Sequence, residues 1–293
     1  MPNVKPNRRA VIGSLIATVA GVAVNRSFCA APAPLPSRPL YRGVSYRRIV
    51  WHSPRPVVFH ILVVQTQTPG LRFFVTPPDY PGTDKPLRAR TTSAFLREYR
   101  LQAVVNADFF YPWKSKGCDY YPHVGDRVTV EGDAVSEGVR YADRDAPNLA
   151  TLHLSKTNRP SLKPPNSGEG WNAVGGRALL RNHKSLALDE YAQTATEPRT
   201  AAGWTPSGDA LFLICVDGRQ AGYSEGVTLA ELAVFFQSLG ATDAINLDGG
   251  GSTAMVVSDG GDGSRLLNRP IDQRVPGKER VVANHLGIYA PPL

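Results

Sequence analysis

The chain has 293 residues, of which 42% are hydrophobic and 20% are charged, so it can bury a full core and its composition excludes a disordered chain. Its formal net charge is +8, and the first thirty residues contribute to it through Lys5, Arg8, Arg9 and Arg26, since no acidic residue there offsets them. The remainder has no block of consecutive basic residues with interleaved aromatic residues, so nucleic acid is not a predicted partner.

The N-terminus has the features of an export signal. Residues 1–9 are basic, and residues 10–24 form an uninterrupted apolar stretch that is too short to span a bilayer comfortably. The pair Arg8-Arg9 is compatible with twin-arginine export, and a retained membrane anchor is the alternative. We therefore predict that residues 1–35 are a signal peptide with a Pro/Ala-rich linker and that the protein is periplasmic or extracellular.

The rest of the chain, residues 36–293, is predicted to be one α+β domain with a mixed β-sheet core and few helices. Alternating or β-branched apolar runs predict strands at residues 56–66, 71–77, 101–107, 126–132, 149–155, 210–216, 243–247, 253–258 and 281–290. Turn-rich connectors separate several of these runs, and no internal repeat or shift in composition marks a second domain.

One predicted helix, residues 228–239, carries a capping box at its start and a glycine after its end. It leads from the strand 210–216 to the strand 243–247, which predicts a β-α-β crossover that carries the site. If the two strands are parallel neighbours, Asp217 and Asp248 emerge together at the carboxyl edge of the sheet, where open sheets place ligands.

The other predicted helix, residues 91–100, leads into a strand that ends at Asn106 and Asp108. Three strands thus end in polar residues, each next to a helix that feeds the strand. Such a constellation indicates a site more strongly than any one of its motifs alone.

The cysteines define no disulfide framework, since Cys118 and Cys215 are compatible with one bridge or with two free thiols. The chain has no C-x-x-C motif and no histidine pair at metal-ligand spacing, so no zinc site is predicted. Asp217, Asp248 and backbone carbonyls suit a hard divalent cation such as calcium or magnesium, and metal dependence is therefore left open.

Six stretches resemble the signature segments of the phosphodiester glycosidase family. In chain order they are NADFF (106–110), VGGRALL (174–180), PRTAAGW (198–204), CVDGRQAGYSEGVTLAEL (215–232), INLDGGGSTAMVV (245–257) and ANHLGIY (283–289). Together they cover the chain from about residue 100 to the end. One departure is Ala107, where glycine is usual, so that the backbone there approaches a ligand less closely.

The resemblance implies a hydrolase that cleaves the glycosidic C–O bond of a sugar-1-phosphodiester, such as N-acetylglucosamine-1-phosphodiester, to a free sugar and a phosphomonoester. Carboxylates suit an oxocarbenium-like transition state, and the predicted catalytic residues are Asp248, Asp217 and Asp108. Arginine binds phosphate with two parallel hydrogen bonds, and glycines let backbone N–H groups point at an anion. The predicted substrate-binding residues are Asn106, Gly176, Arg199, Thr200, Arg219, Asn246, Gly249, Gly250 and Ser252.

Two other functions are compatible with these motifs. One is a non-catalytic protein that binds exopolysaccharide or cell-envelope glycan, in which Trp204 and Tyr223 would line a groove. The other is a metal-dependent phosphoesterase that cleaves a P–O bond. In each case the predicted partner is a glycan or a sugar phosphodiester, and no stable protein partner is predicted.

Overall fold

The computed structural model describes four stretches of the chain, residues 37–114, 117–143, 149–164 and 171–293. They belong to one compact unit, Ala33–Leu293. The predicted export signal, residues 1–35, lies outside the described residues. Across the described stretches, no helix combines the length and the apolar character that a membrane crossing requires.

The described residues form mostly β-sheet with three α-helices, which is consistent with the predicted α+β class. The helices are α1 (Thr92–Tyr99), α2 (Glu190–Thr194), α3 (Leu229–Ser238) and the 3₁₀ helix η2 (Gly250–Ser252). α1 and α3 are the two predicted helices, and Thr228 and Glu231 form the predicted capping box of α3. α2 is an addition to the prediction, because five residues are too few to show a helical period.

Twelve strands form the largest sheet in the described part of the chain. Its main path runs, in spatial order, β1 (Arg38–Tyr41), β2 (Val44–Trp51), β3 (Val57–Gln65), β16 (Ala210–Val216), β15 (Arg199–Trp204), β17 (Asp243–Asn246), β13 (Asn172–Arg181), β11 (Ala150–Leu154) and β12 (Pro160–Ser161). Three further strands extend it, namely β9 (Ala134–Ser136), β10 (Val139–Ala142) and β14 (Lys184–Ser185).

Three smaller sheets complete the described fold. The five-stranded sheet has the order β19 (Ser264–Leu266), β18 (Met255–Ser258), β6 (Ala103–Asn106), β22 (His285–Tyr289) and β4 (Arg72–Val75). The three-stranded sheet has the order β5 (Leu87–Arg88), β8 (Arg127–Val130) and β7 (Phe110–Tyr111), and the hairpin joins β20 (Ile271–Asp272) to β21 (Val275–Pro276).

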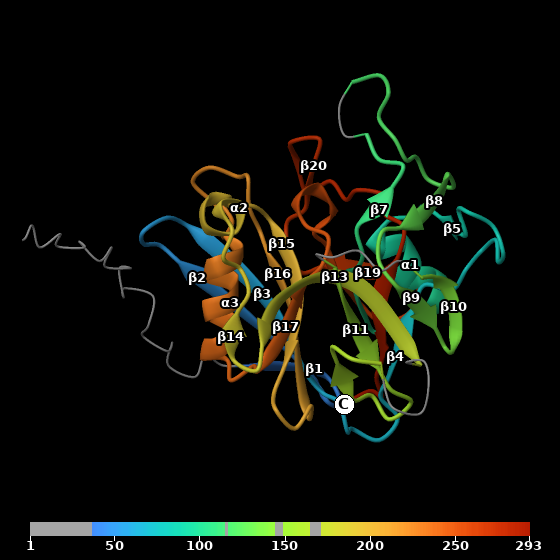
Figure 1. Ribbon diagram of the computed structural model, residues 1–293, viewed down its shortest axis with the longest axis horizontal. Coiled ribbons are helices and arrows are strands. Elements are labelled where there is room, and N and C mark those ends of the chain that lie inside the picture. The colour runs from blue at the N-terminus through green and yellow to red at the C-terminus, as the bar shows by residue number, and fades with distance from the viewer. Residues whose placement is uncertain (1–36, 115–116, 144–148, 165–170) are drawn as a thin grey trace, which may run out of the picture. The chain divides into compact units, whose positions relative to one another are not determined.

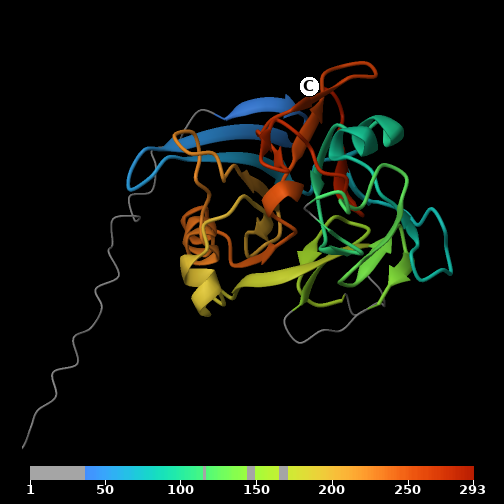
Figure 2. The same cartoon turned by 90° about the horizontal axis from the view of Figure 1, so that it is seen from above.

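The two sheets lie face to face between two helices, which gives four layers in the order α3, twelve-stranded sheet, five-stranded sheet and α1. The core between the two sheets includes Leu62, Val105, Leu213, Met255 and Leu286. A second core joins α3 to the outer face of the large sheet and includes Phe59, Ile214, Leu232 and Phe236. α1 covers the outer face of the five-stranded sheet through Phe95 and Leu96. Figures 1 and 2 show α3 (orange) and α1 (teal) apart, with strands between them.

This layering explains the long apolar runs of the sequence. β3 and β16 lie in the middle of the large sheet, and their side chains enter the two cores alternately. A strand that is buried on both faces needs apolar residues at every position, which is why the predicted strands 56–66 and 210–216 read as continuous hydrophobic segments.

β15, which the strand pattern does not predict, decides how the site is arranged. It lies between β16 and β17 and pairs antiparallel with both, so those two strands run in the same direction but are not neighbours. The two strands are therefore parallel, but the condition that they are neighbours is not met. Gly203 of β15 leaves room for α3, because a Cβ there would lie 2.5 Å from the Phe236 ring. Since β15 begins where its neighbours end, Arg199 lies at the same sheet edge as Asp217 and Asp248.

Candidate active site

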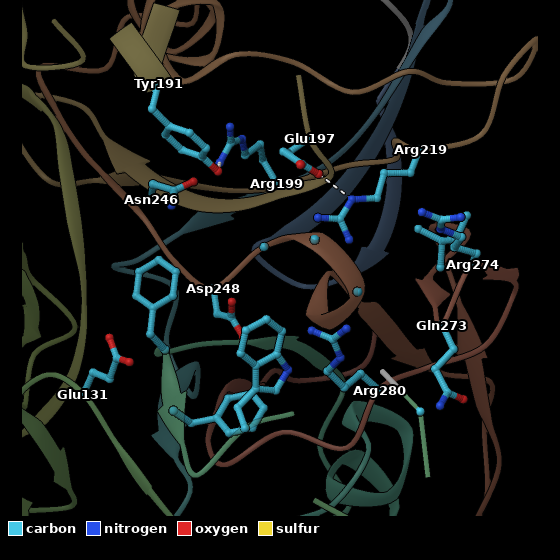
Figure 3. Close-up of a pocket in the computed structure, with 18 residues that line it drawn as sticks. Glu131, Tyr191, Glu197, Arg199, Arg219, Asn246, Asp248, Gln273, Arg274 and Arg280 are labelled. Carbon is cyan, nitrogen blue, oxygen red and sulfur yellow. Dashed lines mark hydrogen bonds and ion pairs between the residues drawn. The ribbon is translucent and has the colours of Figure 1, made fainter. Parts of the chain in front are cut away.

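A cavity of about 1170 Å³ opens at this sheet edge. Its charged lining residues are Glu131, Glu197, Arg199, Arg219, Asp248, Arg274 and Arg280, and its aromatic lining residues are Phe109, Phe110, Trp113 and Tyr191 (Figure 3). Asn246 and the glycines 249–251 also line it. The cavity is large for a small-molecule site, which is typically about 300–1,000 Å³.

Asp248 follows β17 and its carboxyl group reaches the cavity. Its backbone is fixed at both ends, because Asp248 N–H donates to the Ala107 carbonyl at 2.8 Å and Asn106 Nδ2 donates to the Asp248 carbonyl at 2.6 Å. Desolvation raises the pKa of Asp248 to about 6, while a hydrogen bond from Ser252 and the positive charge of Arg280 lower it. The carboxyl group can therefore change its protonation state near neutral pH.

The three glycines after Asp248 leave room for other groups. A Cβ at Gly249 would lie 2.7 Å from the Pro198 carbonyl oxygen, and one at Gly250 would lie 3.1 Å from Arg219 Nη2. A Cβ at Gly251 would collide with the Arg280 guanidinium group. Two guanidinium groups thus lie against the backbone of one glycine segment.

Each of these two arginines is held by a carboxylate partner. Arg219 Nε donates to Glu197 Oε2 at 2.5 Å, and Arg280 Nε donates to the buried Asp272 at 2.8 Å. For Arg219 these contacts leave both terminal nitrogens without a partner among the described residues. Arg199 is bound differently, because its Nε and one Nη donate to backbone carbonyls and hold it in the wall of the cavity.

Glu197 is paired with Arg219, but the other charges around Asp248 lie on different sides of it. In Figure 3, Arg219, Arg274 and Arg280 lie on one side of Asp248 and Glu131 lies on the other. Burial raises the pKa of Glu131, and its negative charge also raises that of Asp248. The cavity therefore offers an anion site and a second carboxyl group on opposite sides of one aspartate.

Asn246 is suited to bind a polar ligand. Its Nδ2 donates to the Leu247 carbonyl at 2.8 Å, which leaves Oδ1 buried and without a hydrogen-bond partner among the described residues. An unsatisfied buried acceptor costs about 1–3 kcal/mol, so a ligand hydroxyl that reaches Asn246 Oδ1 would be bound favourably.

Four other predicted binding residues occupy different places. Asn106 Oδ1 accepts hydrogen bonds from Thr200 Oγ1 at 2.7 Å and from the Ala254 N–H at 3.1 Å, so both polar side chains are satisfied beneath the cavity. Gly176 allows β13 to approach β17, because a Cβ there would lie 2.5 Å from the Asn246 carbonyl oxygen. Ser252 lies under the cavity, where its side chain forms a hydrogen bond with the Asp248 carboxyl group.

Asp108 lies behind the cavity wall and is fully buried. Its Oδ2 accepts hydrogen bonds from the N–H groups of Gly132 at 3.2 Å and Gly175 at 3.1 Å, while Oδ1 has no partner in the described part of the chain. Desolvation raises the pKa of Asp108 well above its usual value. Gly132 directly follows Glu131, so Asp108 fixes the backbone beside a cavity carboxylate.

Asp217 also lies outside the set of residues that line the cavity. Its two oxygens accept four hydrogen bonds, which come from His60 Nε2, Tyr223 Oη, Asn268 Nδ2 and Arg269 N–H. Trp204 is buried in the core between the sheets, and Tyr223 faces Asp217. Neither aromatic residue lines the groove that a glycan-binding role requires of them.

Sequence reasoning overlooks several residues of the cavity, namely Trp113, Glu131, Tyr191, Glu197, Arg274 and Arg280. One signal was present for Glu131, because it lies at the end of the predicted strand 126–132, and it directly follows the observed β8 as Asp217 follows β16. The arginines Arg274 and Arg280 lie outside every motif, and only the fold brings Arg274 to the cavity and Arg280 to the glycine segment.

The cysteines form neither a disulfide nor part of a metal-ligand group in the described residues. Cys118 is exposed, Cys215 is buried in β16, and both are free thiols, so the disulfide considered from the sequence is not formed. Among the residues that the structure describes, no three His, Cys, Asp or Glu side chains are grouped to hold a metal ion.

Comparisons with known proteins agree with the sequence motifs. The model of the family described as phosphodiester glycosidase matches residues 99–289, which confirms the resemblance. Human N-acetylglucosamine-1-phosphodiester alpha-N-acetylglucosaminidase is 27% identical over 247 residues, which are 80% of this chain and 46% of that protein. The bovine protein of the same name is 25% identical over 222 residues, covering 72% of this chain and 41% of its own length. The chain thus spans less than half the length of these relatives.

Solved structures share the fold at lower identity. The catalytic domain of zebrafish N-acetylglucosamine-1-phosphodiester alpha-N-acetylglucosaminidase superimposes with a TM-score of 0.58 at 19% identity, covering 89% of this chain and 85% of that one. A hypothetical protein from Synechocystis gives a TM-score of 0.56 at 15% identity, covering 88% and 64% of the two chains.

Proposed function

The chain belongs to the phosphodiester glycosidase family, and from this premise we propose that it is an exported hydrolase of sugar-1-phosphodiesters. It cleaves the glycosidic C–O bond and releases a free sugar and a phosphomonoester. Family membership supports the class of reaction, the basic and apolar N-terminus supports export, and N-acetylglucosamine-1-phosphodiester is the first substrate to test because the relatives are named for it.

One observation carries the proposal: Asp248 lies between a side of the cavity with three arginines and a side with Glu131. A sugar phosphodiester is complementary to this arrangement, with an anionic phosphate on one side of the anomeric carbon and neutral hydroxyls, which can donate hydrogen bonds, on the other. When the phosphate lies on the arginine side and the sugar lies on the Glu131 side, the C1–O bond of the substrate lies next to Asp248.

The phosphate group occupies the side of Arg219 and Arg280. Guanidinium groups bind phosphate oxygens through paired N–H donors, and the bare backbone of the glycine segment lets the phosphate approach both arginines. The same contacts stabilise the phosphomonoester as it leaves. Because that leaving group is already a stable anion, positive charge contributes more to the reaction than proton donation does.

The sugar occupies the side of Asn246 and Glu131. The unpartnered Asn246 Oδ1 accepts from a sugar hydroxyl, and Glu131 supplies the second carboxyl group that glycoside hydrolysis uses. The exposed rings of Trp113 and Tyr191 provide apolar surface for pyranose faces at the rim.

The reaction consumes one water molecule. Asp248, ionised above a pH of about 6, delivers an electron pair toward C1, either directly or by removing a proton from the attacking water. The bond between C1 and the bridging oxygen breaks, and its electron pair stays on the phosphate. The water oxygen ends on C1 of the sugar, and the bridging oxygen ends in the phosphomonoester.

This atom balance defines the test. The purified chain is incubated with an N-acetylglucosamine-1-phosphodiester in ¹⁸O-labelled water, and mass spectrometry locates the label. We expect ¹⁸O in the free sugar and none in the phosphomonoester. Label in a phosphate-containing product would show P–O cleavage and support the phosphoesterase.

Matched variants complete the experiment. Asp248→Asn should abolish product formation, whereas Asp84→Asn, at an exposed position away from the cavity, should leave it unchanged. No product from this or related diesters, combined with measurable binding of the same compounds, would favour the glycan-binding function instead.

A further inference from the structure

Arg219 has a backbone conformation that is unusual for an arginine. Its φ angle is +56°, in the left-handed region that non-glycine residues seldom adopt. It lies in the short loop between Asp217 and Ser224, and its side chain crosses to Glu197 and the surface of Gly250. A strained backbone persists only where the surrounding structure fixes it, and such positions concentrate at functional sites.

The Asp217 carboxylate connects three parts of the chain at the base of this loop. Oδ2 accepts from His60 Nε2 of β3 at 3.0 Å and from Tyr223 Oη of the loop itself at 2.9 Å. Oδ1 accepts from Asn268 Nδ2 at 3.2 Å and from the Arg269 N–H at 2.9 Å. All four bonds are made by a side chain that is fully buried.

The backbone of the loop is closed by the residues that follow. Ser224 Oγ donates to the Asp217 carbonyl at 2.6 Å and accepts from the Val58 N–H at 3.0 Å. Gln220 and Ser224 exchange backbone hydrogen bonds, and Gln220 Nε2 donates to the Arg269 carbonyl at 2.9 Å. Arg219 is therefore presented from a loop whose two ends are both fixed through Asp217.

We propose that Asp217 is a positioning residue, which holds the loop of residues 218–224 so that Arg219 points into the cavity, and that it does not touch the substrate. The consequence for activity rests on the proposed function, since it is Arg219 that binds the phosphate. An Asn at position 217 keeps one oxygen and can satisfy only one pair of the four donors, whereas Tyr223→Phe removes a single donor and keeps the ring.

The first experiment measures the loop directly and needs no substrate. Hydrogen–deuterium exchange is followed in wild type, Asp217→Asn, Tyr223→Phe and the exposed control Asp84→Asn. We expect faster exchange in residues 218–224 for Asp217→Asn, a smaller increase for Tyr223→Phe and none for the control. Unchanged exchange in Asp217→Asn would overturn the proposal, and circular dichroism verifies that each variant is folded.

The second experiment is a double-mutant cycle on kcat/KM. Asp217→Asn should lower kcat/KM by about 10- to 100-fold, as misplacement of a binding group does. If Asp217 acts through Arg219, the double variant Asp217→Asn/Arg219→Gln should be no worse than Arg219→Gln alone, within about twofold. Additive losses would show that Asp217 acts on the reaction independently and would overturn the proposal.

The pH profile separates positioning from proton transfer. A positioning residue leaves both limbs of the pH profile of kcat/KM in place. Asp217→Asn should therefore show the same apparent pKa values as wild type at lower activity. Loss of a limb would assign Asp217 to the chemical step. Full activity of Arg219→Gln would refute the phosphate role of Arg219 in the proposed function, and the exchange experiment would still decide the positioning role.

Discussion

The ends of β16 and β17 carry the same Asp–Gly pair in opposite surroundings. Asp217 is enclosed, and four donors from three segments satisfy its carboxylate. Asp248 is only partly buried, receives a hydrogen bond from Ser252, and faces the cavity. β15 separates the two strands, so each aspartate has its own environment at the same sheet edge.

The difference shows what makes an aspartate available for chemistry. A carboxylate whose acceptor sites are filled by donors of the protein has no lone pair to offer to a substrate. A desolvated carboxylate with few donors has a raised pKa and keeps its reactivity. The number of donors, together with access to a cavity, therefore distinguishes the two roles where the local sequence does not.

The largest expected effect comes from Asp248→Asn, which should lower kcat by about 10³-fold or more, within the range for loss of an essential acid–base group or nucleophile. Its stability at pH 8 should not fall, because the variant no longer carries a charge whose desolvation opposes folding. Steady-state kinetics and urea unfolding of wild type and variant check both parts. A variant with near-normal kcat would remove Asp248 from the mechanism.

Asp217→Asn should behave in the opposite way. Breaking a buried charged network that lacks access to water should lower the free energy of unfolding by about 3 kcal/mol. The activity loss should be smaller than that of Asp248→Asn. Urea unfolding of the two variants in parallel tests the contrast, and equal stability of both would show that the four hydrogen bonds contribute little.

The pH dependence sharpens the comparison further. The pKa of Asp248 is raised from the ordinary 3.8 to about 6 with Glu131, Arg280 and Ser252 near it, so kcat/KM should rise with pH by about tenfold per unit below 6 and level off above it. The stability that this group contributes is present below about pH 4 and is lost as the pH rises through 6. A profile in which activity falls as the pH rises through 6 would instead make Asp248 a proton donor.

The smallest effect is expected from the glycine segment. Gly250→Ala places a Cβ 3.1 Å from Arg219 and should raise KM several-fold by displacing the guanidinium group. Gly261→Ala is the matched control, because Gly261 also has a positive φ but nothing within 4 Å, so both variants have a similar backbone cost of about 1–2 kcal/mol. Equal KM values for the two variants would mean that the contact with Arg219 does not affect binding.

Much of the fold follows from the sequence where burial is uniform. The strands β3 and β16 are buried on both faces and read as apolar runs, and α3 shows its capping box and its glycine stop. β15 is not recognisable from its small residues, and Gly203 is small because it admits the Phe236 ring of α3. A strand defined by contact with a helix has no signature of its own.

The candidate site follows from the sequence only in part. Asp248, Asn246, Arg199 and Arg219 belong to motifs and do line the cavity. Asn106 and Thr200 belong to motifs too, yet they hydrogen-bond each other below it. These motifs contain both side chains that shape the site and side chains that face it, so a motif alone does not separate the two.

The cavity is built from parts that differ in how much they support the rest of the molecule. Its floor is the buried end of β17, whereas Gln273 and Arg274 lie on the exposed hairpin between β20 and β21, and Trp113 is half exposed. Substitutions on the hairpin leave the core intact, while substitutions on the floor disturb both sheets. New ligand preferences can therefore evolve at the rim of this cavity without any change at its floor.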